Sequence, residues 1–224
     1  MGRGRSKAGG SGGRIITPVE PPLDVWSYRH RAGNEPFVDA INTAARTMEN
    51  DFPGLMQDVG TLNAVKLRGR DNGVLGYFSR DGRGGTSVNI NQEYTDLAEM
   101  NAAMDRAAKS GFHPSRGNKS GVEAVSLHEL GHALNNHVAA KMGFNPNDVF
   151  KMEYAADKIV KDARKAAGKI AGRGGIEQFR RSISGYSSGS NTETIAEAVA
   201  DYYCNGRNAK TASKAIMAEL FKYK

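Results

Sequence analysis

The stretch SGVEAVSLHELGHALNNHV, residues 120–138, is the part of the chain around which the rest is arranged. Ser120 followed by Glu123 is a capping box that starts a helix. Gly143 and Pro146 supply a stop signal beyond its end. Apolar residues recur between these signals at helical spacing, at Val122, Val125, Leu130 and Leu134. The spacing therefore predicts one helix that runs through the sequence HELGH.

The predicted helix carries a metal-binding pattern, because His128, Glu129 and His132 stand in the order H-E-x-x-H. Residues four apart in a helix lie one turn above each other on the same face, so both imidazoles can bind one ion. Two neutral imidazoles, a third protein ligand and an open position for water suit Zn²⁺. The ion lowers the pKa of that water, and Glu129 lies where it can accept the proton. We therefore expect a zinc site with Glu129 as its general base.

The composition is that of a globular protein with one domain. The chain has 224 residues, of which 39% are hydrophobic and 25% are charged, and this length can bury a substantial core. We expect neither a membrane span nor a secretory signal peptide, because no apolar run of about 18 residues and no hydrophobic leader segment is present. The single cysteine, Cys204, excludes an intramolecular disulfide and fits a reducing compartment. We expect it to be a small buried or half-buried helix residue rather than a nucleophile.

The basic character is concentrated near the N-terminus. Of the net charge of +7, four positive charges lie in MGRGRSKAGGSGGR, residues 1–14, which leaves +3 for the remainder. These Gly, Ser and basic residues bury too little apolar area to order themselves, and a proline-rich lead-in follows at 17–23. We expect residues 1–23 to be a flexible tail ahead of one domain at 24–224. A weak, salt-dependent contact of the tail with nucleic acid is the functional alternative.

Hydrophobic periodicity predicts an α+β fold. The turn sequences DNG and DGRGG separate three predicted strands, at 62–67, 74–78 and 86–90. We expect these strands to form a small sheet of about three strands with antiparallel pairing. The helical period predicts several helices before and after the strands, at 35–52, 95–109, 120–138, 146–167, 192–203 and 212–223.

Two histidines leave a zinc site one ligand short, and no third histidine is placed to complete it. The pattern H-E-x-x-H-x-x-G-x-x-H needs a glycine at position 135 and a histidine at position 138, where this chain has Asn135 and Val138. His137 is one position off, and a turn of roughly 100° directs it away from the ion. We expect His137 to lie on a face of its own helix or to support the site, rather than to bind the ion. His30 and His113 stand in polar loop sequence, where surface or capping roles are expected.

Acidic residues on two downstream helices are the remaining candidates for the third ligand. Glu193, Glu197 and Asp201 are spaced four apart and therefore share one face of a predicted helix. That face is either a solvated acidic surface or, since alanines flank the acids, a face that another helix approaches closely. Glu153 begins an E-x-x-x-D pattern among apolar positions of an earlier helix and is the alternative ligand.

The combination of HELGH with Tyr186, Asn191 and ETIAEAVADYY resembles the catalytic domain of anthrax lethal factor and its relatives. These relatives include zincin-like domains of bacteriophage head-associated proteins. The resemblance covers residues 85–208 and is specific at the two motifs. It implies a zincin-like fold of the glutamate-ligand type, or gluzincin, in which the third zinc ligand is the first glutamate of an E-x-x-A-E motif, Glu193 here. It also implies that Tyr186, seven residues earlier, assists catalysis.

The same resemblance implies a function and a place of action. Glu197 would hold a ligand histidine or support its helix, and Asp201 would lie beside it or carry surface charge. The chain would be a zinc metalloendopeptidase whose peptide or protein substrate adds in extended form to an edge strand at 86–90. A phage virion or head-morphogenesis protein that keeps the fold and contacts other phage structural proteins is the alternative, as is a delivered toxin protease. The implied location is the host cytoplasm or the phage virion.

Overall fold

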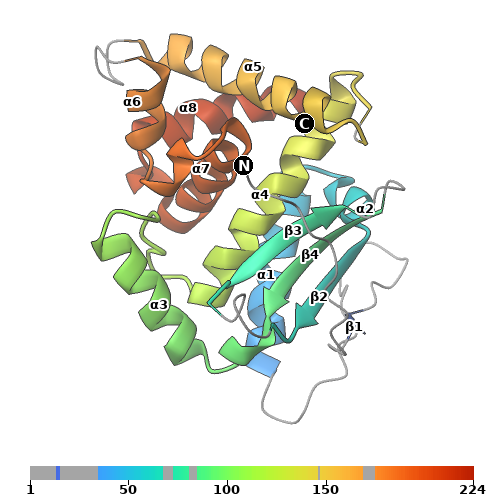
Figure 1. Cartoon of the computed structure of the whole chain (residues 1–224), viewed down its shortest axis with the longest axis vertical. Coiled ribbons are helices and arrows are strands. Elements are labelled where there is room, and N and C mark those ends of the chain that lie inside the picture. The colour runs from blue at the N-terminus through green and yellow to red at the C-terminus, as the bar shows by residue number, and fades with distance from the viewer. Residues whose placement is uncertain (1–13, 16–34, 68–72, 81–84, 146, 169–174) are drawn as a thin grey trace.

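The computed structural model describes residues 14–15, 35–67, 73–80, 85–145, 147–168 and 175–224 (Figure 1). Most of the tail predicted at 1–23 lies outside these residues, as does His30. The described part contains eight α-helices and a small mixed sheet, so the chain is an α+β protein. No described helix combines the length and the apolar character that a membrane crossing requires.

Most of the helices follow the predicted pattern. Two short helices, α2 (Leu55–Val59) and α6 (Ile176–Arg181), were not predicted, because so few residues span too little of the helical period. The predicted cap at the start of the HELGH helix is present, since the Ser120 Oγ accepts the Glu123 N–H at 3.1 Å. Six helices lie at the predicted places: α1 (Glu35–Asp51), α3 (Leu97–Lys109), α4 (Gly121–Lys141), α5 (Val149–Ala167), α7 (Asn191–Asn205) and α8 (Thr211–Leu220).

The sheet is mixed rather than antiparallel. Its strand order is β1-β2-β4-β3, with bounds β1 (Arg14–Ile15), β2 (Thr61–Val65), β4 (Thr86–Asn91) and β3 (Gly76–Arg80). Strands β3 and β4 pair antiparallel, but β4 then lies parallel to β2, so the prediction of an antiparallel sheet is wrong. The last four residues of β4 are all buried, which agrees with its place between β2 and β3 in the sheet.

The edge strand beside α4 is β3, not the strand at 86–90. Strand β2 pairs with one side of β4 and β3 pairs with the other, so an added peptide cannot reach β4. The prediction of an edge strand at 86–90 is therefore wrong. Within the described strands β3 pairs only with β4, and it runs along α4 (Figure 1). An extended ligand that adds to the sheet beside α4 would therefore pair with β3.

Helix α4 is the centre of the molecule. It is buried on nearly every side rather than along one stripe, because α1 and the sheet cover it on one side and α7 covers it on another (Figure 1). Gly131 of α4 lies directly against Ala196 of α7. A Cβ atom at this glycine would stand 2.8 Å from the Ala196 Cα, far inside ordinary contact. Small residues on both helices therefore allow the close approach that brings the acidic face of α7 to HELGH.

Candidate metal centre

Three side chains from two helices converge at one point. His128 and His132 lie one turn apart on α4, and Glu193 lies in the first turn of α7. One carboxylate oxygen, Glu193 Oε2, is 3.3 Å from His128 Nε2 and 3.4 Å from His132 Nε2. Ligand atoms placed tetrahedrally at about 2.0–2.2 Å from Zn²⁺ stand about 3.3–3.6 Å from one another. Both distances therefore fit ligands that surround one ion.

One of the donor atoms at this point, a Glu193 carboxylate oxygen, lacks a hydrogen-bond partner among the described residues. Glu193 Oε2 is buried and accepts no hydrogen bond, and such an unsatisfied oxygen costs about 1–3 kcal/mol. The side chains of His128, Glu129 and His132 place ligand atoms within 4.8 Å of one another, and this group could hold a metal ion. Two carboxylates thus reach the centre. Glu193 is the better ligand, because a single oxygen of it lies close to both Nε2 atoms.

The position of Glu193 follows from how α7 begins. The Ser190 Oγ accepts the Glu193 N–H at 3.0 Å, which fixes the first turn of the helix. Burial disfavours the charged form of Glu193, but the adjacent His128 and His132 outweigh it and hold the pKa of this carboxyl well below its usual value. Glu193 is therefore an anion that faces two imidazole nitrogens.

Glu197 lies one turn further along α7 and contacts the His128 ring at Nδ1, the nitrogen that is directed away from Glu193. Its Oε1 is 2.8 Å from His128 Nδ1 and 2.9 Å from His113 Nδ1, and its Oε2 accepts the Ser184 hydroxyl at 2.6 Å. Burial opposes its charge, but His113 and His128 lower the pKa of Glu197 to about 2. A carboxylate on Nδ1 leaves Nε2 as the free ligand atom of His128. The acidic face of α7 is thus directed inward, and the alternative of a solvated surface is wrong.

Glu129 is held beside the histidines by the sheet. Its side chain is buried, and the Phe78 N–H of the edge strand β3 donates to its carboxylate. Burial raises the pKa of Glu129 above its usual value, although His128 and His132 partly offset this. Gly76 of β3 permits the contact, since a Cβ atom there would stand 3.2 Å from the Glu129 Cγ.

Tyr186 faces the same histidines from a separate turn. It begins the 3₁₀ helix η4 (Tyr186–Ser188), and its N–H donates to the Phe112 carbonyl at 3.0 Å. Its ring centroid lies 5.9 Å from that of His128. Burial, together with the nearby carboxylates of the centre, raises the pKa of Tyr186 to about 12. The phenol therefore keeps its proton near neutral pH.

His113 is the site residue that the sequence-based prediction missed. Besides its contact with Glu197, its ring packs edge-on to Tyr186 with centroids 5.0 Å apart and lies 6.1 Å from His128. The prediction of a surface or capping role is therefore wrong. No spacing rule could have found it, because only the folding of the loop against α7 brings it to Glu197.

The remaining candidates lie elsewhere. Asp201 is buried and accepts the Asn205 amide at 2.9 Å and the Lys210 N–H at 2.8 Å, so it supports the start of α8 instead of a ligand histidine. Glu153 accepts the Asn191 N–H at 3.2 Å and lines a neighbouring pocket. His137 is directed toward α2, where its Nδ1 lies 2.7 Å from an Asp58 oxygen.

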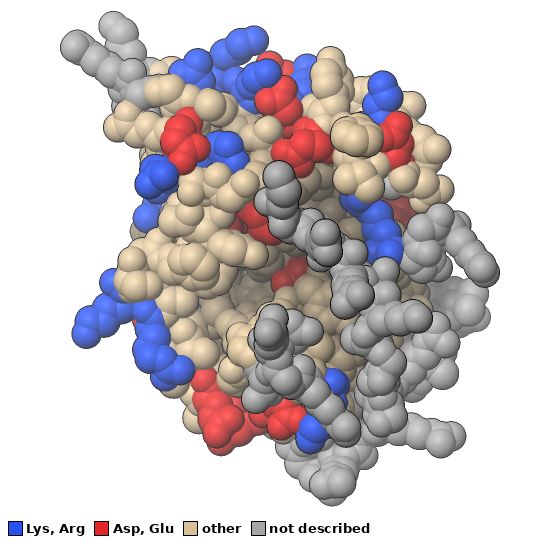
Figure 2. All heavy atoms as spheres, viewed as in Figure 1, with Lys and Arg blue, Asp and Glu red and all other residues tan. Residues whose placement is uncertain are grey.

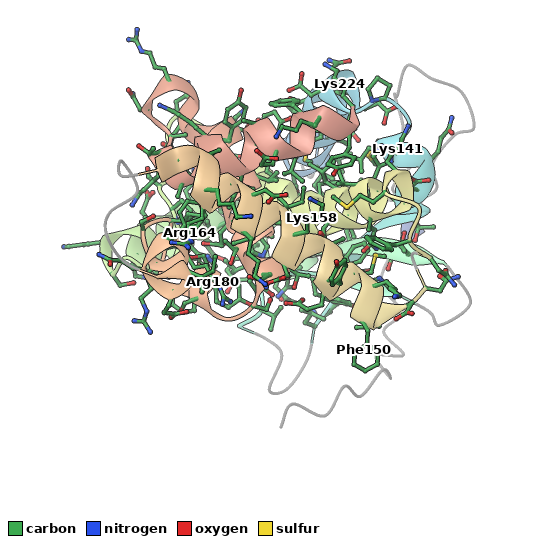
Figure 3. All side chains as sticks on the ribbon, turned by 90° about the horizontal axis from the view of Figure 1, so that it is seen from above. Lys141, Phe150, Lys158, Arg164, Arg180 and Lys224 are labelled. Carbon is green, nitrogen blue, oxygen red and sulfur yellow. The ribbon has the colours of Figure 1, made fainter. Side chains whose placement is uncertain are left out.

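Two pockets flank the metal centre along β3. The larger, about 490 Å³, begins at His128 and Glu129, and its walls include Val74, Tyr94, Met104, Phe112, Val125 and Tyr186. The smaller, about 350 Å³, begins at His132 and lies between the end of β3 and the start of α5. Figure 2 shows this face hollowed, with acidic side chains on the floor of the depression.

Comparisons with known proteins found no match. No protein-family model matches the chain, and no curated protein or solved structure matches it either. The function therefore has to be inferred from the geometry of the centre and its pockets.

Proposed function

We propose that this chain is a zinc-dependent metallopeptidase in which His128, His132 and Glu193 hold the metal. The observation that supports this best is the position of one Glu193 oxygen at 3.3 Å and 3.4 Å from the two Nε2 atoms. The chemistry of the donors, two imidazoles and one carboxylate, matches a catalytic zinc site that keeps a position for water. Glu129 and Tyr186 stand beside these ligands, as hydrolysis would require.

The side chains divide the chemistry between them. Bound Zn²⁺ would supply a Lewis acid and lower the pKa of the attacking water. Glu129, which is buried beside both histidines, would accept a proton from that water and deliver it to the amine of the cleaved bond. Tyr186, whose ring lies 5.9 Å from that of His128, would donate a hydrogen bond from its phenol to the oxygen on which negative charge develops.

The substrate in this proposal is an extended peptide on the outer edge of β3. An edge strand offers main-chain groups to which such a peptide can add. The β3 edge also runs past both pockets, since Gly76 lines the larger one and Phe78 to Arg80 line the smaller one. Side chains on either side of the cleaved bond would enter these pockets.

Peptide cleavage by the zinc-loaded protein tests the proposal. We expect cleavage of members of a peptide library, and inhibition by a chelator that added zinc reverses. Glu129→Gln should keep its zinc, measured by elemental analysis, and lose cleavage. Glu99→Gln, on the exposed face of α3, is the matched control and should retain both. Full activity of Glu129→Gln would reject the assignment of the general base.

Zinc binding without peptide cleavage would point to a different function. Zinc that binds stoichiometrically and raises the melting temperature, without cleavage of any library member, would reject the peptidase. It would instead favour a structural use of the metal, such as the phage head-morphogenesis role that the family resemblance implies.

A further inference from the structure

The smaller pocket contains a cation that the peptidase chemistry does not use. Arg80 is the last residue of β3 and lines this pocket together with His132. Its partners in the described part of the chain are neutral: a terminal guanidinium nitrogen donates to the Asn136 side-chain oxygen, and the guanidinium lies 5.6 Å from the centre of the Phe78 ring. Its Nε is buried and has no hydrogen-bond partner. Among the described residues no carboxylate pairs with this guanidinium.

A carboxylate is the group that would pair best with the Arg80 guanidinium in this pocket. A planar guanidinium donates two parallel hydrogen bonds to a carboxylate, and such charge-assisted bonds are the strongest available to it. Burial lowers the pKa of Arg80, which shows that the pocket disfavours an uncompensated positive charge. Glu153 lies in the same pocket, but its carboxylate accepts the Asn191 N–H at the start of α7, with an N–O distance of 3.2 Å. Of the described pocket residues, the one acid is thus already bound elsewhere, which leaves the guanidinium to a carboxylate of the ligand.

The direction of β3 decides which part of a substrate meets Arg80. The strand begins at Gly76, against Glu129, and ends at Arg80, against Asn136, which lies one turn beyond His132. A peptide that adds antiparallel, the more stable arrangement, runs the opposite way and passes Arg80 before it reaches the catalytic carboxylate. Arg80 is thus close to residues on the N-terminal side of the cleaved bond.

Resting on the proposed function, we propose that Arg80 selects substrates with Asp or Glu one or two residues before the cleaved bond. The carboxylate of that residue enters the pocket between β3 and α5 and pairs with the guanidinium. The pocket beside His128 has an apolar wall and receives residues after the cleaved bond. The preferred substrate therefore carries an acid ahead of the cleaved bond and an apolar side chain behind it.

Matched peptides test the proposal. Three peptides would differ only in Glu, Gln or Lys at each of the two positions before the cleaved bond. We expect kcat/KM of the wild type to be at least about tenfold higher for the Glu peptide than for the Gln peptide, at one of the two positions. Arg80→Gln should remove this difference while it still cleaves the Gln peptide, and Arg80→Glu should favour the Lys peptide. Arg181→Gln, exposed on α6, is the control.

The outcomes separate this proposal from the proposed function. Cleavage by the wild type with equal kcat/KM for Glu and Gln peptides, at both positions, overturns the role of Arg80 and leaves the peptidase intact. Absence of any cleavage overturns the peptidase. In that event binding of the same peptides to zinc-loaded Glu129→Gln, followed by fluorescence anisotropy, still measures the preference. Equal affinities there, or a preference that survives in Arg80→Gln, would again reject Arg80.

Discussion

Gly131 of α4 and Ala196 of α7 touch so closely that a methyl group on the glycine would stand 2.8 Å from the Ala196 Cα. The glycine inside HELGH therefore has a role beyond helix formation. It sets the distance between the helix that carries both histidines and the helix that carries Glu193, and so it sets the spacing of the three donor atoms.

Replacement of this glycine should separate the two helices. We expect Gly131→Ala to lower the free energy of unfolding by about 1–3 kcal/mol, as overpacking does, and to weaken zinc binding as Glu193 moves away. Urea unfolding and competition with a zinc chelator measure the two effects. Gly73→Ala is the control, because nothing lies within 4 Å of a Cβ at that position. Wild-type zinc affinity in Gly131→Ala would contradict the role given to this contact.

The third ligand can be identified by metal content. Glu193→Ala should purify with little zinc, because it removes the oxygen that lies near both histidines. Glu153→Ala should keep its zinc, since that carboxylate binds the Asn191 N–H instead. Elemental analysis of both variants, with circular dichroism to verify folding, decides between them. Zinc loss in Glu153→Ala alone would reverse the assignment.

Glu197 acts through His128 and should affect affinity rather than stoichiometry. Glu197→Gln replaces the carboxylate on His128 Nδ1 with a neutral amide, which orients and polarises the imidazole less well. We expect zinc affinity to fall by about 10–100-fold, the usual effect of such a supporting residue. Competition with a chromogenic chelator measures this. An unchanged dissociation constant would show that His128 needs no such support.

The acid stability of the metal-free protein should also depend on Glu197. The pKa of this carboxyl is about 2 in the folded protein, below its ordinary value of 4.5. Its contribution to stability is therefore complete above pH 4.5 and is lost as the pH falls toward 2. The urea midpoint of chelator-treated wild type should fall more between about pH 6 and pH 3 than that of Glu197→Gln. Equal losses would show that Glu197 is not stabilised in the folded state.

Cys204 should be unreactive in the native protein. It is buried, as the sequence indicated, and burial raises the pKa of its thiol to about 12. Only the thiolate reacts with alkylating reagents, so we expect labelling near pH 8 to be more than about 100-fold slower than in denaturant. Mass spectrometry of iodoacetamide-treated samples measures this. Rapid labelling of the folded protein would contradict the burial of Cys204.

Local signals predicted the elements of this fold but not all of their pairings. Helices α4 and α7 could be predicted because helical spacing, and in α4 also a serine cap, is visible within a short stretch of sequence. The insertion of β4 between β2 and β3 depends on contacts between distant segments, and strand sequences alone do not encode which neighbour each strand takes.

In the candidate centre, too, residues on one helix could be predicted from local spacing, whereas a contact between distant segments could not. His128, Glu129 and His132 follow from one helical repeat, and Glu193 from a motif associated with it. His113 reaches the centre only through the carboxylate of Glu197, which itself lies on another helix. A contact that depends on three separate segments has no periodicity to detect.

The outer edge of β3 has a consequence for solubility. An open edge strand is a template on which a second copy of the chain can pair and begin to aggregate. This edge is only five residues long and ends in a charged arginine. The strand proposed to bind an extended substrate is thus a poor template for a second copy of the chain, because it is short and carries a charge at its end.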